Sequence, residues 1–586
     1  MASSQSFRTD IQALRGLAIL LVLLYHAELI GSLRAGYLGV DIFFTVSGYL
    51  ITGIVVQDLR AGNFTFIAFY ARRAKRLLPA AYVTFLATTL AAIFFLTPPE
   101  MRDYSRQLLG AVTFTGNIVL WMQTGYFESA AQLKPLLHIW SLSLEEQYYL
   151  LLPAALVFTP RRLWTSGVWL VLGASLTLCL MLVAVKPGAT FYLLPTRAWE
   201  LALGSLGILV LEGSPYQLWL GRLFWPAFVT LLVLPFYPTG LPHPGLDALL
   251  VCCATLVVLL RRHPVFNQTG PARFLARVGD ISYSLYLVHW PLLAFAANAW
   301  LTAIPLGVRM GLVILALVLG WALFRWVERP LRRAVVPIGG LTVGLTLASS
   351  CGLVILAFAV NAFDQWGDPV DFSGGRQGNP GYCTAFESND TFSLQPECQS
   401  GEQPSLLVWG DSYAMHLVPA IAATTSRGVL QATKSTCGPL LGLSHYRTDA
   451  FFNRTWGLSC LRFNRSVLDY LAGPEGESIQ VVVISSFLGQ YLGGQVLIEP
   501  PCEDGVDACH TPVDGEGSQD LAAQALVKAI AAIRALGKQV VLVAPTPTAS
   551  FDVGRCLLRR SLGKLTFGAP GGSCAIPEGN YSLPSA

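Results

Sequence analysis

Residues 7–29, FRTDIQALRGLAILLVLLYHAEL, place Arg15 and His26 within an otherwise aliphatic run. The two residues are eleven positions apart. On an α-helix this is about 16 Å of rise and close to a whole number of turns. Both side chains therefore project from one face, one near each end. Ionisable groups at membrane depth are costly and usually face a protein interior or a water-filled cavity. The pair predicts either a site along this face or a snorkelling arginine with a buried, hydrogen-bonded histidine.

The composition places the chain in a membrane. Of its 586 residues, 53% are hydrophobic and 13% are charged, whereas soluble domains contain about 25% charged residues. This excludes an ordinary soluble protein and indicates an integral membrane protein. The net charge of +4 is less informative than the positions of the Lys and Arg residues.

Eleven apolar runs are long enough, or nearly long enough, to cross a bilayer. They lie at 13–30, 38–56, 78–97, 138–158, 163–185, 192–211, 222–237, 246–260, 281–299, 306–327 and 340–362. The run at 222–237 is short and contains proline, and the stretch 98–137 is typical of an interfacial or re-entrant segment.

Basic clusters predict the orientation of these runs. They are Arg72, Arg73, Lys75 and Arg76; Arg161 and Arg162; Arg261, Arg262, Arg273 and Arg277; and Arg329, Arg332 and Arg333. With eleven crossings all of them fall on one side, which the positive-inside rule makes cytoplasmic. The N-terminus is then inside and the part after the last run is outside.

The sequence after residue 400 changes to an α/β rhythm. Strand runs such as SLLV and IQVVVISS alternate with helical stretches such as AMHLVPAIAATT, which predicts a parallel sheet with crossover helices. Eight cysteines lie in this polar part: Cys383, Cys398, Cys437, Cys460, Cys502, Cys509, Cys556 and Cys574. An even set of this kind predicts disulfides in an oxidising compartment, with the pairing left open. There is no CxxC pair or Cys/His cluster, so we expect no metal site.

Motifs in residues 8–335 resemble, in order, those of the membrane acyltransferase-3 family. They are R-x10-H from Arg15 to His26, GYLGVDIFFTVSGYLI (36–51), FYARRAKRLLPA (69–80), LLHIWSLSLEEQYYLLLP (136–153), GDISYSLYLVHWP (279–291) and WVERP (326–330). The resemblance implies that His26 takes part in acyl transfer. It also implies that Arg73 and Arg76 bind the acyl-CoA donor on the cytoplasmic side.

The chemistry of these residues fits that implication. Coenzyme A carries several phosphates, and clustered arginines supply forked donors suited to them. A positive-inside anchor with no ligand explains the same charges. We expect Arg15 to steady the donor and His26 to act as general base toward an acceptor hydroxyl, or to carry the acyl group. The pantetheine arm is long and thin, so acyl groups could cross while coenzyme A stays inside.

Other polar residues lie in apolar surroundings, where each alone is more often an internal hydrogen-bond or ion partner than a catalyst. They are Asp41, His138, Glu145, Glu146, Arg197, Glu200, His289 and Glu328. We expect Asp41, after the outer turn near His26, to orient the imidazole, as carboxylates do in nucleophilic triads. We assign His138, Glu145 and His289 to substrate binding.

The segment VWGDSYAMHL (408–417) resembles the opening block of the SGNH hydrolase family, with Ser412 at the nucleophile position. A serine there begins a helix, whose N-terminal N–H groups can stabilise an oxyanion. Gly438, in STCGPL, matches the glycine of the second block. Fusion of these two domain types is a known architecture.

Other SGNH blocks depart from the pattern. The asparagine block is not evident, because SSFLGQY carries Gly489 and Gln490 at the expected place. The closing Asp-x-x-His should follow the last strand, but Asp507 and His510 precede it, so we interpret DACH as a chance match. We expect an SGNH-like domain that is C-terminally incomplete. Three alternatives stay open: an inactive domain, one that binds glycan without chemistry, or a serine that takes its base from elsewhere.

These observations predict a polytopic helical membrane domain of about ten helices plus one linking helix, followed by a flavodoxin-like α/β domain in the periplasm. The predicted parts are 1–335 (acyltransferase-3), 336–362 (linking helix), 363–400 (linker) and 401–586 (SGNH-like). By resemblance, we expect an inner-membrane O-acetyltransferase that uses acetyl-CoA as donor substrate and holds no permanent cofactor. Its expected partners are a lipid-linked or surface glycan acceptor and membrane lipid, with no nucleic acid.

Lipopolysaccharide O-antigen is the first choice of acceptor, ahead of peptidoglycan or exopolysaccharide. Two rival functions are a transporter or flippase with an outer binding domain and a tethered periplasmic esterase. No inverted repeat or pair of broken helices favours the first, and the acyltransferase-3 motifs count against it. The lack of a properly placed catalytic histidine counts against the second.

Overall fold

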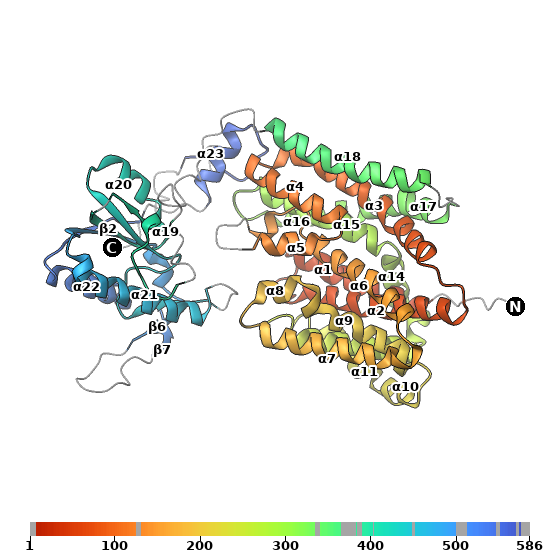
Figure 1. Cartoon of the computed structure of the whole chain (residues 1–586). Coiled ribbons are helices and arrows are strands. Elements are labelled where there is room, and N and C mark those ends of the chain that lie inside the picture. Colours follow the sequence, from red (N-terminus) through yellow and green to blue (C-terminus); the bar gives the residue numbers. More distant parts are fainter. Residues whose placement is uncertain are drawn as a thin grey trace. The chain divides into compact units, whose positions relative to one another are not determined.

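The computed structural model describes residues 8–124, 130–334, 340–364, 383, 389–401, 403–447, 452–499, 512–545, 551–569 and 574–575. The chain forms two compact units (Figure 1). The helical unit comprises Met1–Pro369 and Arg555–Gly572, and the C-terminal unit comprises Val370–Gly554 and Ser573–Ala586.

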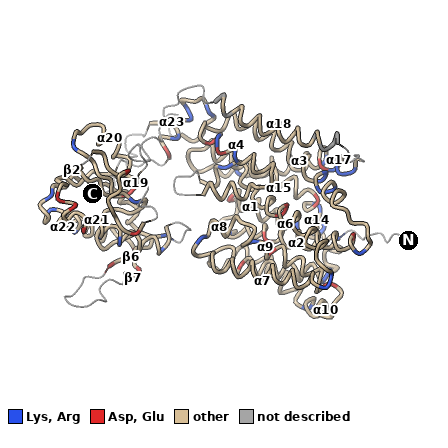
Figure 2. The backbone as a smooth tube through the Cα atoms, viewed as in Figure 1, with Lys and Arg blue, Asp and Glu red and all other residues tan. Residues whose placement is uncertain are grey.

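Each of the predicted apolar runs contains a helix. These helices are α1 (Thr9–His26), α2 (Gly39–Arg60), α3 (Phe66–Phe95), α6 (Ile139–Phe158), α7 (Trp164–Leu182), α9 (Leu194–Leu206), α11 (Phe224–Val233), α12 (Leu246–Arg261), α15 (Ser282–Ala299), α16 (Leu306–Leu323) and α18 (Gly340–Asp364). Charged residues are sparse along them (Figure 2). Shorter helices complete the unit: α4 (Pro98–Val112), α5 (Gly116–Met122), α8 (Pro187–Tyr192), α10 (Pro215–Leu220), α13 (Val265–Gln268), α14 (Gly270–Asp280), α17 (Arg329–Arg333) and α23 (Val553–Ser561).

Six helical segments in the described residues are long and apolar enough to cross a bilayer on their own. They are Thr9–His26, Gly36–Arg60, Phe66–Phe95, Arg161–Leu182, Pro187–Leu211 and Leu306–Arg333. A shorter apolar helix covers Thr346–Val360. The prediction of a polytopic helical domain is therefore confirmed, while the number of crossings and their orientation stay predictions.

Glycines fix how closely α1 approaches α14. A Cβ atom on Gly16 would lie 1.9 Å from the Leu275 carbonyl oxygen, and one on Gly279 would lie 1.8 Å from the Gln12 carbonyl oxygen. The two helices thus touch backbone to backbone, as small residues allow in membrane bundles. Because α1 also carries Arg15 and His26, this contact sets the position of both side chains.

The C-terminal unit is built on a five-stranded sheet of order β1-β3-β2-β5-β8. Its strands are β1 (Gln399–Ser400), β2 (Pro404–Gly410), β3 (Gly428–Thr433), β5 (Val481–Ser485) and β8 (Gln539–Leu542). β3, β2, β5 and β8 run parallel, and β1 is antiparallel to β3. The predicted parallel sheet is confirmed. The central strand β5, VVVIS, is fully buried, as expected of a strand covered on both faces, whereas the edge strand β8 is largely exposed.

Helices and a second sheet surround this core. The helices are α19 (Ser412–Met415), α20 (Val418–Thr424), α21 (Arg454–Ala472) and α22 (Gln519–Ala535). The second sheet is antiparallel, with β4 (Leu443–His445), β6 (Gln495–Ile498) and β7 (Val513–Glu516). Asn453 caps α21, and Ser518 caps α22, each by accepting backbone N–H hydrogen bonds.

Disulfides occur in the polar part of the chain, as predicted. Cys383 pairs with Cys398, and Cys437 pairs with Cys460. Cys556 and Cys574 are disulfide-bonded as well. Cys502 and Cys509 lie outside the described residues.

The structure divides the chain differently from the sequence at one point. We assigned all of 401–586 to the SGNH-like domain, but Arg555–Gly572 belongs to the helical unit. The physical reason is a set of backbone and side-chain hydrogen bonds, such as that from Phe567 N to Ala299 O at 2.7 Å.

Gly279→Ala is expected to lower the thermal stability of the protein, because its Cβ would overlap the backbone of α1. We expect a loss of roughly 1–3 kcal/mol, measured as a lower unfolding midpoint in detergent. Gly311→Ala is the matched control, since a Cβ there has nothing within 4 Å and alanine favours a helix. An unchanged midpoint for Gly279→Ala would contradict the tight α1–α14 contact.

Candidate active site

Three histidines from separate parts of the helical unit converge. His26 is the last residue of α1, His289 lies in α15, and His138 immediately precedes α6. His26 Nδ1 lies 3.2 Å from His289 Nε2, and the two rings are stacked with centroids 5.5 Å apart. The His138 ring is edge-on to His289 at 5.8 Å. Sequence reasoning singled out all three residues, but only the fold shows that they form one cluster.

The hydrogen bonds of His289 determine the proton positions in this cluster. Its Nδ1 lies 2.7 Å from the Tyr286 carbonyl oxygen. A carbonyl only accepts, so His289 Nδ1 carries the proton and, in the neutral ring, Nε2 accepts from His26 Nδ1. His26 Nε2 is then unprotonated and available as a base. Triads hold their histidine with a second group in the same way.

An inner cavity of about 200 Å³ is lined by the predicted donor-binding residues Arg15, Arg73 and Arg76. Arg73 pairs with Glu146 at 2.7 Å and lies over the Tyr149 ring at 4.0 Å. Within the described chain, Arg15 and Arg76 form no ion pair with a carboxylate. Arg15 donates to Gln12 at 3.3 Å. Neither guanidinium therefore lies within ion-pair distance of a carboxylate among the described residues, although Glu328 attracts both at longer range.

Further residues link the inner cavity to the histidines. Glu145 lines the cavity and accepts a hydrogen bond from Tyr149 at 3.1 Å. Tyr286 also lines it, and its hydroxyl donates to the His138 carbonyl oxygen at 2.9 Å. The same tyrosine holds His289 through its own carbonyl. Tyr286 thus connects the inner cavity to two of the three histidines by hydrogen bonds.

A second cavity of about 440 Å³ is lined by His26 itself. We call the two cavities inner and outer after the orientation predicted from the sequence. His26, Trp290 and Trp300 line the outer cavity, together with Arg309 and Arg555. Trp290 packs against the His26 ring with centroids 4.6 Å apart. His26 therefore borders the outer cavity while its Nδ1 faces the histidine cluster.

The structure corrects the expected role of Asp41. Asp41 is fully buried and pairs with Arg197 at 3.2 Å, while Arg197 also pairs with Glu200 at 2.7 Å. The group that faces His26 Nδ1 is His289, not Asp41. A buried carboxylate needs a nearby cation, and Arg197 on α9 supplies it. Sequence reasoning named Arg197 and Glu200 as polar residues but could not foresee their partner.

At the carboxyl edge of the parallel sheet, three loops meet beside Ser412. Gly410 of β2 is in register with Thr433 of β3 and Ser485 of β5. Ser412 begins α19 directly after β2, as the SGNH resemblance implies. The carboxyl edge of such sheets is their usual ligand site.

Asp411 holds these loops together. Its carboxylate accepts hydrogen bonds from Ser486 Oγ at 2.6 Å, Phe487 N at 2.9 Å and Gln490 Nε2 at 3.1 Å, and caps α19 through Tyr413 N at 2.9 Å. Burial raises the pKa of Asp411, while these hydrogen bonds oppose the rise. Gln490, which stands where the asparagine block was expected, is thus a partner of Asp411.

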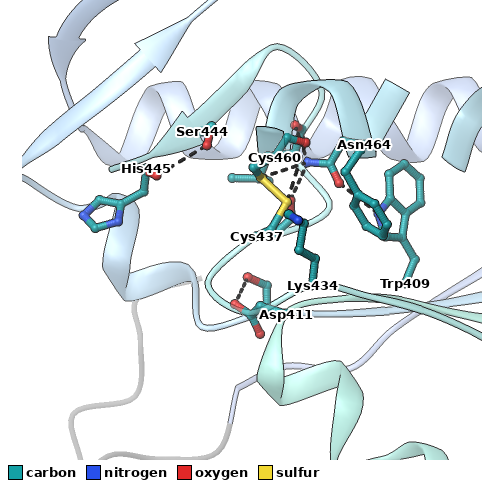
Figure 3. Close-up of a disulfide and its surroundings, with 12 residues drawn as sticks. Trp409, Asp411, Lys434, Cys437, Ser444, His445, Cys460 and Asn464 are labelled. Atoms are coloured by element: carbon teal, nitrogen blue, oxygen red, sulfur yellow. Dashed lines mark hydrogen bonds between the residues drawn. A yellow bond between two sulfur atoms is a disulfide. The ribbon is translucent and has the colours of Figure 1, made fainter. Parts of the chain in front are cut away.

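The loop with Gly438 is fixed by the disulfide Cys437–Cys460 (Figure 3). Asn464 of α21 donates to the Gly438 carbonyl oxygen at 2.8 Å and accepts from Trp409 Nε1 at 3.0 Å. The Gly438 N–H donates to Tyr491 Oη at 2.9 Å. Sequence reasoning did not single out Asn464, because no motif marks it.

The histidines in the described part of the C-terminal unit are His416 and His445. His416 Nδ1 lies 3.2 Å from the Ser412 carbonyl oxygen. Asp507 and His510 lie outside the described residues.

Family models match both parts of the chain. An acyltransferase domain model matches residues 8–325, and a model described as an SGNH domain fused to AT3 domains matches residues 382–582. No solved structure matches the chain.

Relatives match a little more than half of the chain. A Komagataeibacter xylinus protein named as the membrane-bound transacylase BcsY is 29% identical over 332 residues, which is 55% of this chain and 82% of that protein. The O-acetyltransferase OatA of Staphylococcus aureus is 27% identical over 56% of this chain and 58% of its own length. The peptidoglycan O-acetyltransferase OatA of Listeria monocytogenes is 26% identical over 56% of each chain. The chain thus spans little more than half the length of the OatA relatives.

Arg197→Met is expected to destabilise the helical unit, because it leaves Asp41 and Glu200 buried without a cation. We expect a loss of roughly 3–5 kcal/mol, seen as a lower unfolding midpoint in detergent. The control is Arg72→Ala, whose side chain is 57% exposed in its pair with Asp58, where less than about 1 kcal/mol is expected. Equal midpoints for the two variants would show that the buried pair does not hold the fold.

Proposed function

The chain belongs to the acyltransferase-3 family and carries a fused SGNH domain, and we propose that it is an O-acetyltransferase of a cell-surface glycan. The donor in this proposal is cytoplasmic acetyl-CoA, and the acceptor is a glycan hydroxyl on the periplasmic side of the inner membrane. The supporting observation is that His26 lines the outer cavity and contacts His289, which is held by Tyr286, a residue that lines the arginine-bordered inner cavity.

The inner cavity suits the donor. Coenzyme A phosphates need cations, and Arg15 and Arg76 border the cavity without carboxylate partners among the described residues. Arg73 is held in place by Glu146. The donor's pantetheine arm would pass Tyr286 toward the histidine cluster. Along α1 the path from Arg15 to His26 covers roughly 16 Å.

His26 would act as the base of the transfer. Its Nε2 takes the proton of the acceptor hydroxyl as the hydroxyl oxygen attacks the thioester carbonyl. A C–O bond forms, the C–S bond breaks, and the thiolate of coenzyme A receives a proton to leave as the thiol. His289 keeps His26 in the required tautomer by accepting from its Nδ1.

Lipopolysaccharide O-antigen is our first choice of acceptor, with peptidoglycan or another surface polysaccharide as the alternative. The printed name of the Listeria relative specifies peptidoglycan for that protein. In a second version of the route, the acetyl group passes from the helical unit to Ser412 before it reaches the glycan. The position of Ser412 at the carboxyl edge of the sheet supports that version.

His26→Ala is expected to reduce acetyl transfer by about 10²–10⁴-fold, the usual contribution of a general base. Transfer is measured as label from radiolabelled acetyl-CoA in purified O-antigen or peptidoglycan, with membranes that contain the chain. His289→Gln, whose amide oxygen can still accept from His26, is expected to keep more activity than His289→Ala.

His263→Ala is the matched control for these variants. Its ring stacks on Phe224 at 4.3 Å, away from the cluster, so we expect unchanged transfer. Wild-type transfer by His26→Ala would refute the proposed mechanism.

Ser412→Ala distinguishes the two versions of the route. If the acetyl group passes through Ser412, transfer to the glycan is lost, because the alanine lacks the hydroxyl that would carry it. Unchanged transfer would mean that the helical unit acylates the glycan directly. The measurement is the same labelled assay, with correct folding checked by the thermal midpoint.

A further inference from the structure

A segment after the last strand of the C-terminal unit belongs to the helical unit and covers the ends of two of its helices. We call residues 555–567 the strap. The strap donates hydrogen bonds to the last carbonyl groups of α3, from Lys564 Nζ to Ile93 at 3.1 Å, Leu565 N to Phe94 at 3.1 Å and Arg559 Nη2 to Phe95 at 2.7 Å. The last carbonyl groups of a helix have no partner within the helix, so the strap supplies one for each of these three.

The strap also donates hydrogen bonds to the last carbonyl groups of α15. Arg555 Nη2 donates to the carbonyl oxygens of Ala297 at 3.4 Å and Asn298 at 2.9 Å, and to Asn298 Oδ1 at 3.1 Å. Phe567 N donates to the Ala299 carbonyl oxygen at 2.7 Å. Positive side chains at helix C-termini are also favoured by the helix dipole.

Glu100, at the start of α4, pairs with two arginines of the strap. It lies 3.4 Å from Arg559 and 3.9 Å from Arg555. Arg559 is fully buried, and this burial lowers its pKa to about 10, although Glu100 opposes the change. A buried arginine with a carboxylate and two carbonyl partners indicates a specific, built contact.

The strap also forms part of the outer cavity. Arg555 lines that cavity together with His26, Trp290 and Trp300. Phe567 packs on the Trp300 ring at 4.7 Å, and its carbonyl oxygen accepts from Leu301 N at 3.0 Å. One wall of the cavity beside His26 is therefore supplied by residues that follow the sheet of the C-terminal unit in the sequence.

We propose that this outer cavity is the acceptor-sugar site and that Arg555 of the strap positions the sugar beside His26. This inference rests on the proposed function. Indole rings offer the flat apolar faces on which sugar rings stack, and a guanidinium donates charge-assisted hydrogen bonds to sugar hydroxyls. The membrane-embedded site is then complete only when the strap is in place.

The test uses the full-length protein in detergent, with labelled acetyl-CoA and O-antigen polysaccharide released from lipopolysaccharide by mild acid. Arg555→Gln and Trp300→Leu are expected to raise the KM for the polysaccharide by roughly ten- to a hundredfold. The KM for acetyl-CoA stays unchanged, because the donor binds at the other cavity. Arg555→Lys, which keeps the charge, recovers part of the loss.

Arg560→Ala is the matched control, since Arg560 lies on the same helix but is exposed. Calorimetric titration of the polysaccharide, without acetyl-CoA, gives a second readout: we expect weaker binding to Arg555→Gln than to Arg560→Ala. Thermal midpoints identify any variant that fails to fold. If Arg555→Gln does not fold, Trp300→Leu, which leaves Arg555 in place, is used to test the sugar site.

The outcomes separate this inference from the proposed function. Acetylation by wild type but not by His26→Ala, with wild-type polysaccharide KM and binding for Arg555→Gln and Trp300→Leu, overturns the sugar site alone. A lower midpoint for Arg555→Gln with unchanged KM and binding overturns it too, because the strap is then only structural. Wild-type transfer by His26→Ala instead refutes the proposed function.

Discussion

The hydrogen bond between His26 Nδ1 and His289 Nε2 is the interaction on which the proposed chemistry depends. It exists because α1 and α15 bring two imidazoles together, and because Tyr286 fixes the proton of His289. One basic nitrogen of His26 is left for an acceptor. The close α1–α14 contact, with no room for a Cβ at Gly16 or Gly279, holds this geometry.

The charged residues of the helical unit fall into two groups, because a buried charge is costly unless it has a partner. Asp41 and Glu200 both pair with Arg197, and none of the three side chains is exposed, so this buried cluster is held together by its own ion pairs. Arg15 and Arg76 border a cavity and have no carboxylate partner among the described residues, which is the arrangement expected of a site that awaits an anionic ligand. Buried arginines of the helical unit thus occur in two settings, in an ion pair with carboxylates or at a cavity, and their partners distinguish the two settings.

Each of the two units is built from two separate segments of the chain. The parallel sheet presents Ser412 and the Asp411-centred loops at its carboxyl edge. The strap joins the helical unit, where it caps α3 and α15 and borders the outer cavity. α3 carries Arg73 and Arg76, and α15 carries His289, so the strap contacts the C-terminal ends of two helices that supply residues of the candidate site.

Much of this protein follows from the sequence alone. Long apolar runs become helices because the backbone must satisfy itself in lipid, and the strand and helix rhythm after residue 400 becomes a parallel sheet. The positions of Arg15 and His26 on one helix face follow from helix geometry. The sequence could not show which residues of different helices are neighbours. We expected Asp41 beside His26, but in the tertiary structure Asp41 pairs with Arg197, and His289 lies beside His26. Nor did any motif mark residues 555–567 as part of the helical unit, because the carbonyl groups that bind them become neighbours only in the tertiary structure.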